Sequence, residues 1–158
     1  MFQYQARDKA LELMKQHGLL EKGWKFGFDN AKRRNGACEY GIKTIWLSRH
    51  YVKLNTEELI VDTILHEIAH ALTPDDRGHG RSWKLKCAEI GAMPVAVKRS
   101  MGVKQVEGAW KAECPNPECD FKVSRHRKPN SRHRYSCNKC SGRYFNWRYE
   151  LIFKKEEK

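Results

Sequence analysis

The run His66-Glu67-Ile68-Ala69-His70 constrains the fold and the chemistry of this 158-residue chain more than any other feature of its sequence. On a helix, two histidines four residues apart emerge from one face, so both imidazoles can bind a single metal ion. Glu67 lies beside them, where its carboxylate can reach a water on the metal rather than the metal itself. The run therefore predicts a zinc site with His66 and His70 as ligands and Glu67 as the catalytic base.

A catalytic zinc ion of this kind takes three protein ligands and keeps one coordination position open. His79 is the third ligand that we expect, because the loop that follows Pro74 can bring its imidazole back over the helix. Three acidic residues remain as alternatives: Asp75, Asp76 and Glu89. Spacing does not single out the group that would stabilise an oxyanion, for which the candidates are His50, Tyr51 and Arg81.

The residues around the motif predict an α+β domain. Apolar residues at helical spacing indicate helices at about residues 4–16, 55–73 and 82–90. Asn55 and Glu58 have the spacing of a capping box at the start of the helix that carries the histidines. Aromatic and β-branched runs indicate strands at about residues 24–28, 37–40 and 43–47. The turn residues Asn35 and Gly36 place residues 33–36 at a hairpin tip.

Four of the six cysteines fall into two close pairs near the C-terminus: Cys114 and Cys119, then Cys137 and Cys140. This spacing predicts a structural zinc ion bound by four thiolates, since a closed shell leaves no position for catalysis. A segment this small cannot bury enough apolar surface to fold without such an ion. His126 and His133 are less favoured substitutes for one of the thiolates.

The net charge of +12 is concentrated toward the C-terminus. Residues 98–158 hold 16 basic and 7 acidic residues, whereas residues 1–97 hold 15 and 12. Aromatic residues are interleaved with the basic ones around the cysteine pairs, and cations meet phosphates while aromatic rings stack on unpaired bases. We therefore expect nucleic-acid contacts from Arg125, Arg127, Lys128, Arg132, Arg134 and Arg143.

The composition argues for a chain without a membrane span. No run approaches the roughly 18 apolar residues that a spanning helix needs, and the mean hydropathy is −0.81. The N-terminus lacks the basic region and apolar stretch of a secretory signal. The sequence therefore predicts a protein of the cytoplasm, or of the nucleus in a eukaryote, and it leaves the oligomeric state open.

These motifs resemble the SprT-like family, which includes the Spartan proteases. The resemblance rests on residues 41–48, residues 57–70 and the run His79-Gly80-Arg81-Ser82-Trp83. It implies a zincin-like metalloprotease domain with three histidines on its zinc ion, followed by a zinc ribbon. It also implies DNA-dependent cleavage of proteins crosslinked to DNA, a repair activity. The first cysteine pair departs from the family's commoner CxxC, because four residues separate its members.

The predicted architecture is a zincin-like domain at residues 1–97, a linker at 98–110, a β-rich zinc ribbon at 111–152 and a disordered tail at 153–158. Residues 43–48 are expected to be the sheet edge at which zincins bind substrate as an added strand. The predicted function is cleavage of DNA-associated or DNA-crosslinked proteins, with one catalytic and one structural zinc ion. The alternative is a non-catalytic protein that binds zinc and nucleic acid, with Asp75 or Asp76 as a fourth ligand.

Overall fold

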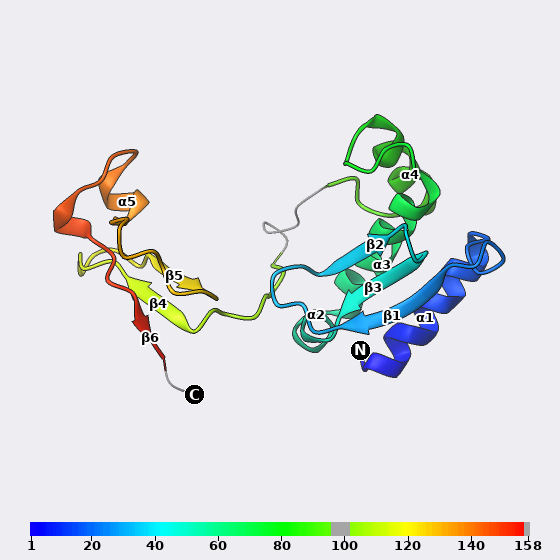
Figure 1. The fold of residues 1–158 in the computed structure, drawn as a ribbon, viewed down its shortest axis with the longest axis horizontal. Helices are drawn as coiled ribbons and strands as arrows, with labels where there is room; N and C mark the ends of the chain where they lie inside the picture. The colour runs from blue at the N-terminus through cyan, green and yellow to red at the C-terminus, as the bar shows by residue number, and fades with distance from the viewer. Residues whose placement is uncertain (96–101, 157–158) are drawn as a thin grey trace. The chain divides into compact units, whose positions relative to one another are not determined.

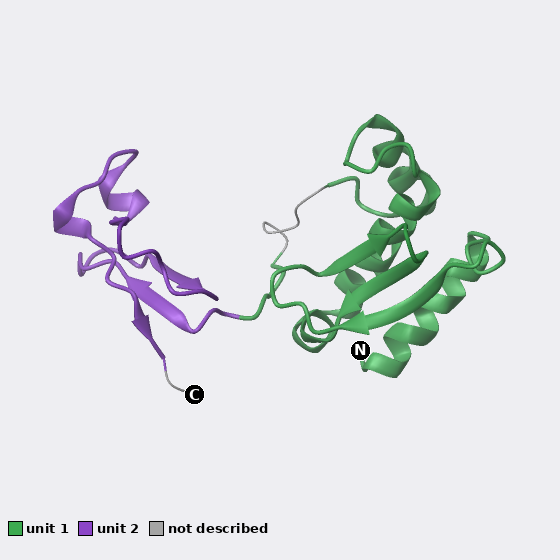
Figure 2. Cartoon of the chain, viewed as in Figure 1, with its two compact units in different colours: residues 1–106 green, residues 107–158 purple. Residues whose placement is uncertain are grey.

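The computed structural model describes residues 1–95 and 102–156 of the chain. The chain forms two compact units, Met1–Val106 and Glu107–Lys158, each with its own core (Figure 2). The division falls within residues 98–110, the segment that the sequence predicts to be a linker. Residues 98–101 of that segment lie outside the described residues.

Asn55 has a different role from the helix cap that the sequence predicts. The helix has Thr56 at its N-cap, and the side-chain amide of Asn55 donates to the carbonyl oxygens of Tyr51 and Lys104, each at 2.9 Å. The backbone N–H of Lys104 donates back to Asn55 Oδ1 at 2.8 Å. The described linker residues up to Val106 therefore pack on the first unit.

Three strands form the sheet of the first unit: β1 (Lys25–Asp29), β2 (Gly36–Glu39) and β3 (Thr44–Ser48). Their order is β1-β3-β2, with β3 parallel to β1 and antiparallel to β2 (Figure 1). Two predictions are therefore wrong. Residues 33–36 are not a hairpin tip, because residues 33–35 belong to the connection between β1 and β2, which do not pair with each other, and Gly36 begins β2. Residues 43–48 form the central strand rather than a sheet edge.

Burial and hydrogen bonds explain the central position of β3. Its Ile45 and Leu47 are fully buried, as expected for a strand with neighbours on both sides. Ser48 at its end fixes the connection between β1 and β2. The Ser48 hydroxyl donates to the carbonyl oxygen of Ala31 at 2.6 Å. The backbone N–H of Ser48 donates to the carbonyl oxygen of Asn35 at 2.8 Å. These contacts join distant segments, so local periodicity could not reveal them.

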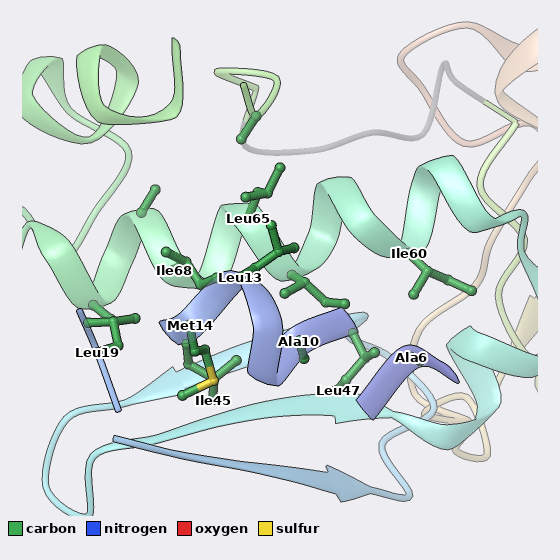
Figure 3. Close-up of a cluster of buried hydrophobic side chains, with 14 of the residues drawn as sticks. Ala6, Ala10, Leu13, Met14, Leu19, Ile45, Leu47, Ile60, Leu65 and Ile68 are labelled. Carbon is green, nitrogen blue, oxygen red and sulfur yellow. The ribbon is translucent and has the colours of Figure 1, made fainter. Parts of the chain in front are cut away.

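Helices α1 (Gln3–Gln16) and α3 (Glu57–Leu72) pack against each other and against the sheet (Figure 1). The small side chains of Ala6 and Ala10 let α1 approach closely, and Met14 fills the space toward Ile45 (Figure 3). These helices agree with the segments predicted at residues 4–16 and 55–73 to within two residues. The interface between α1, α3 and β3 is the core of the first unit.

The rotation of α3 about its axis is set by an isoleucine stripe. Ile60, Ile64 and Ile68 follow one another at every fourth position and are each 0% exposed. His66 and His70 lie two residues on either side of Ile68, which is about 200° around the helix. Burying the stripe therefore turns both histidines to the opposite side of α3.

The described residues of the first unit contain two further helices. The sequence did not predict α2 (Arg49–Leu54), which is too short for its periodicity to stand out. Helix α4 (Arg81–Ile90) agrees with the prediction, and it ends where Gly91 adopts a left-handed φ of 80°. Within residues 1–95 and 102–156, no helix is long and apolar enough to cross a membrane.

The second unit is built on a small antiparallel sheet. Its strands are β4 (Trp110–Glu113), β5 (Lys122–Arg125) and β6 (Lys154–Lys155), in the order β5-β4-β6 (Figure 1). A short helix α5 (Asn138–Ser141) has Cys137 at its N-cap and contains Cys140, and a 3-10 turn η2 (Trp147–Tyr149) follows it before β6. The buried core is very small and comprises Ala112, Cys137 and Leu151.

Strand β6 corrects the predicted disordered tail at residues 153–158. It pairs with Trp110 and Lys111 of β4, and the Lys111 ammonium lies 2.9 Å from the Glu156 carboxylate. The lysine-rich end of the chain thus completes the sheet instead of leaving it. Residues 157 and 158 lie outside the described part of the chain.

Candidate metal centres

Three histidines meet on the side of α3 that faces α4. His66 and His70 come from the helix, and His79 comes from the loop between α3 and α4. The Nε2 atom of His79 lies 3.2 Å from that of His70 and 3.3 Å from that of His66. Zinc–nitrogen bonds of 2.0–2.1 Å in a tetrahedron put two nitrogens about 3.3–3.4 Å apart. The three side chains therefore fit the ligand set of a zinc ion.

Trp83 of α4 is the surface on which the three imidazoles pack. Its side chain is 0% exposed, and its ring centroid lies 4.7 Å from that of His66, 5.3 Å from that of His70 and 4.5 Å from that of His79. The sequence analysis names Trp83 only as part of the family resemblance, as the aromatic residue four positions after His79, and predicts no role for it. Its position fixes the orientation of the imidazole rings.

Burial keeps His70 in the form that binds metal. The loss of hydration, followed by the proximity of His79, lowers the pKa of His70 to about 4. A neutral imidazole therefore predominates near pH 7, and metal binding requires neutral histidine. The hydroxyl of Tyr40 also donates to the carbonyl oxygen of His70 at 3.0 Å, which ties the end of α3 to the residue that follows β2.

Asp76 holds the loop that carries His79. Its Oδ1 accepts from the N–H of Gly80 and its Oδ2 accepts from the N–H of Trp83, each at 3.1 Å. These backbone hydrogen bonds lower the pKa of the Asp76 carboxyl, and they satisfy donors at the start of α4. Gly80 has no room for a side chain, because a Cβ there would lie 2.5 Å from Asp76 Oδ2.

The acidic residues that competed with His79 lie elsewhere. Glu89 pairs with Lys86 at 2.6 Å, and both carboxylate oxygens of Asp76 accept hydrogen bonds from α4. Among the described residues, the metal-ligating group around His66 and His70 gains only His79, so it includes neither these two carboxylates nor Asp75.

Glu67 lies between α3 and the sheet. Glu67 is 7% exposed. Its negative charge acts on the thiol of Cys38, which lies on the face of β2 that looks toward α3. Burial first, and the charge of Glu67 second, raise the pKa of the Cys38 thiol to about 12. The carboxylate predicted as the catalytic base is therefore confined between the histidine helix and an edge strand.

One candidate for stabilising an oxyanion is excluded by the structure. Tyr51 is buried, and its hydroxyl donates to the Leu59 carbonyl oxygen and accepts from the Thr63 hydroxyl, each at 2.9 Å. Tyr51 therefore joins α2 to α3 in the core. His50 is partly exposed beside it, and Arg81 is exposed at the start of α4.

The four cysteines form a second cluster, in the second unit. Cys114 Sγ lies 3.8 Å from Cys140 Sγ, and Cys119 Sγ lies 3.7 Å from Cys137 Sγ. Zinc–sulfur bonds of about 2.3 Å in a tetrahedron put two sulfurs about 3.8 Å apart. The cluster thus has the dimensions of a four-thiolate zinc site, despite the longer first pair. His126 and His133 are exposed and are not members of it.

The six residues predicted to contact nucleic acid divide into two groups. Arg125 stacks on the rings of Tyr135 and Phe153, at 4.3 and 5.1 Å, and Arg134 forms a two-pronged ion pair with Glu150. Both therefore have partners within the unit, although the Arg134 side chain is itself 62% exposed. The Lys128 ammonium also has a partner, since it lies 5.7 Å from the centre of the Trp110 ring. The other three are exposed: Arg127, Arg132 and Arg143.

The aromatic residues of the second unit divide in the same way. Phe121, Tyr135 and Tyr149 pack around the small core. Tyr144 and Trp147 are 83% and 70% exposed, and the guanidinium of Arg148 lies 5.6 Å from the Trp147 ring. Sequence alone could not separate these groups, because burial in so small a sheet depends on the tertiary fold. The exposed aromatics lie in residues 144–147, directly after α5.

Replacing Asp76 with alanine is expected to weaken zinc binding at the histidine site. Without the carboxylate, the loop loses its attachment to α4, and supporting residues of this kind contribute about 10- to 100-fold to metal affinity. Chelator competition on protein with its cysteine site filled would measure the change. Asp75→Ala is the matched control, since it removes the same charge one residue earlier. Equal affinities in both variants would contradict the role given to Asp76.

Replacing Cys137 with alanine is expected to unfold the second unit while leaving the first unit folded. The residue combines a buried core position with a predicted metal ligand, and the remaining core is too small to hold the sheet. Elemental analysis would report the loss of one metal ion, and amide NMR would report which residues lose dispersion. Cys87→Ala in the first unit should retain full metal content. A folded second unit in Cys137→Ala would refute the prediction.

Comparison with known proteins gives the chain a family. The SprT-like family model matches residues 5–104. The germ cell nuclear acidic-1 protein of Caenorhabditis elegans is 30% identical over 133 residues, which is 76% of this chain and 24% of the relative. Protein SprT of Pseudomonas savastanoi pv. phaseolicola is 27% identical over 99 residues, 56% of this chain and 58% of the relative.

Among solved structures, the metallopeptidase zymogen jannalysin of Methanocaldococcus jannaschii aligns with a TM-score of 0.46 and 20% identity, covering 53% of this chain and 79% of its own. The chain spans about a quarter of the length of the C. elegans relative and just over half of the Pseudomonas protein. Because the family model matches 100 consecutive residues, including all three histidines, the chain belongs to the SprT-like family.

Proposed function

We propose that this protein is a zinc-dependent peptidase that acts on proteins associated with nucleic acid. The observation that carries the proposal is the set of three histidine Nε2 atoms spaced like zinc ligands, with Glu67 next to His66 on the same helix. The family membership supports the same reading.

Each residue has a distinct role in the proposed reaction. His66, His70 and His79 hold the metal, and Trp83 and Asp76 hold the imidazoles in place. Zinc supplies Lewis-acid chemistry when bound, by polarising a water and a peptide carbonyl. Glu67 takes a proton from the attacking water and delivers it to the leaving amine. The four cysteines hold a second zinc ion that stabilises the fold of the second unit.

The proposed link to nucleic acid rests on the surface of the second unit. Its exposed cations can contact phosphates, and its exposed aromatic residues can stack on bases that are not paired. Tyr144 and Trp147 favour a single-stranded ligand, because base faces are covered in a duplex. DNA is the nucleic acid that the resemblance to the Spartan proteases implies. The first unit would then cleave proteins that are bound or crosslinked to the same DNA, in the cytoplasm or the nucleus.

A non-catalytic zinc- and nucleic-acid-binding protein is the alternative. It requires a fourth protein ligand that closes the histidine site, with Asp75 or Asp76 as the candidates. Asp76 is occupied by backbone donors of α4, and among the described residues neither aspartate belongs to the ligand group. These contacts favour the peptidase.

Replacing Glu67 with glutamine is expected to abolish cleavage of a DNA-bound basic protein. The amide cannot accept the proton, and general base catalysis contributes about 10²- to 10⁴-fold. Zinc content and DNA affinity should match those of the wild type, which elemental analysis and a binding titration would check. Wild-type activity in Glu67→Gln would rule out the proposed mechanism. A zinc-loaded wild type that cleaves no DNA-bound protein would favour the non-catalytic alternative.

Replacing Trp147 with alanine is expected to weaken binding of single-stranded DNA by about 5- to 150-fold, because stacking of one base contributes about 1–3 kcal/mol. Duplex binding should change less. Fluorescence anisotropy with both ligands at a fixed salt concentration would measure this. Tyr4→Ala is the control, since it removes an exposed aromatic from the first unit. An equal effect of both variants would exclude the proposed stacking surface.

A further inference from the structure

Gly36 begins the edge strand β2 and lies directly against Glu67. In the β2–β3 register, Gly36 is opposite Leu47 and Cys38 is opposite Ile45, so Gly36 and Cys38 share the face that looks toward α3. A Cβ atom built on Gly36 would lie 2.9 Å from both Cγ and Oε1 of Glu67. It would also lie 3.0 Å from the carbonyl oxygen of Trp46.

Distances under 3.0 Å are essentially never seen for real Cβ atoms, so a side chain at this position would displace its neighbour. The atoms that would have to move first are Cγ and the carboxylate oxygen Oε1 of Glu67, the residue that we propose as the general base. Gly36 is not among the glycines with positive φ. The need for glycine here therefore comes from the contact with Glu67 and not from the backbone conformation.

We infer that Gly36 is a positioning residue for Glu67. Because it has no side chain, the edge strand packs directly on Glu67 and removes the rotamers that would carry the carboxylate away from the histidines. The charge of Glu67 also raises the pKa of Cys38, two residues along the same face, which agrees with close packing of β2 on this side chain. The catalytic consequence rests on the proposed function, whereas the contact between Gly36 and Glu67 does not.

The chain offers two matched glycines for comparison. At Gly41, in the turn after β2, nothing lies within 4 Å of an added Cβ. At Gly27 on β1, an added Cβ would lie 2.5 Å from the Trp46 ring, on the outer face of the sheet. Gly41→Ala thus controls for the substitution itself, and Gly27→Ala controls for a clash that disturbs the sheet without touching Glu67.

Gly36→Ala is expected to lower kcat by about 100-fold, the effect of misplacing a reacting group by about 1 Å. The KM and the zinc content should stay within about twofold of the wild type, because the added methyl group meets Glu67 and leaves the histidines unchanged. Gly41→Ala should retain full kcat, and Gly27→Ala should lower the unfolding midpoint with little loss of kcat. A loss of kcat in Gly27→Ala as large as in Gly36→Ala would overturn the inference.

A second measurement tests the contact without relying on activity. Gly36→Ala should lower the urea midpoint of unfolding in the Glu67 background and much less in the Glu67→Ala background, where the carboxylate is gone. Equal shifts in the two backgrounds would overturn the inference. If the zinc-loaded wild type cleaves no protein, the proposed function fails, and this coupling still decides whether Gly36 positions Glu67.

Discussion

The burial of the isoleucine stripe of α3 is the contact on which the rest of the first unit depends. Ile60, Ile64 and Ile68 are buried in the core together with residues of α1 and the sheet. The helix cannot rotate without exposing these side chains, and burial of each contributes about 1.5–3 kcal/mol to the stability of the fold. This fixed rotation turns His66 and His70 away from the sheet and toward Trp83 of α4. It also places Glu67, one residue along, in the seam between α3 and β2. The hydrophobic core therefore sets the directions of groups that are themselves polar.

The third histidine depends on a different kind of interaction. His79 lies in a loop, and loops take a fixed geometry only where their backbone polar groups are satisfied. Asp76 provides this by accepting from two N–H groups at the start of α4. Trp83 on the same helix contacts all three rings, stacked on His70 and edge to face with His66 and His79. The ligand set thus combines two residues fixed by apolar packing with one fixed by hydrogen bonds.

Apolar packing and long-range hydrogen bonds differ in how far they can be predicted from sequence. Helices α1, α3 and α4 and the three strands of the first unit follow from local periodicity and turn residues, and their bounds agree with the structure within two residues. Motif spacing points to the three-histidine cluster. The position of β3 in the middle of its sheet could not be read locally, because its parallel pairing with β1 depends on distant contacts through Ser48. Asn55 looks like a cap in sequence, but its amide has a partner 49 residues away. Gly36 looked like a turn residue, and only its closeness to Glu67 reveals another constraint.

The pairing of β4 with β6 has a consequence for how the second unit can be used. Trp110 lies near the start of the second unit and pairs with Lys155, which lies near the end of the described chain. The entry and exit of the unit therefore lie on adjacent strands, which is the geometry that lets a module be inserted into a loop of another protein with little strain. The unit also has its own small core and its own cysteine cluster, so both ends of its sheet can be joined to other segments without disturbing either.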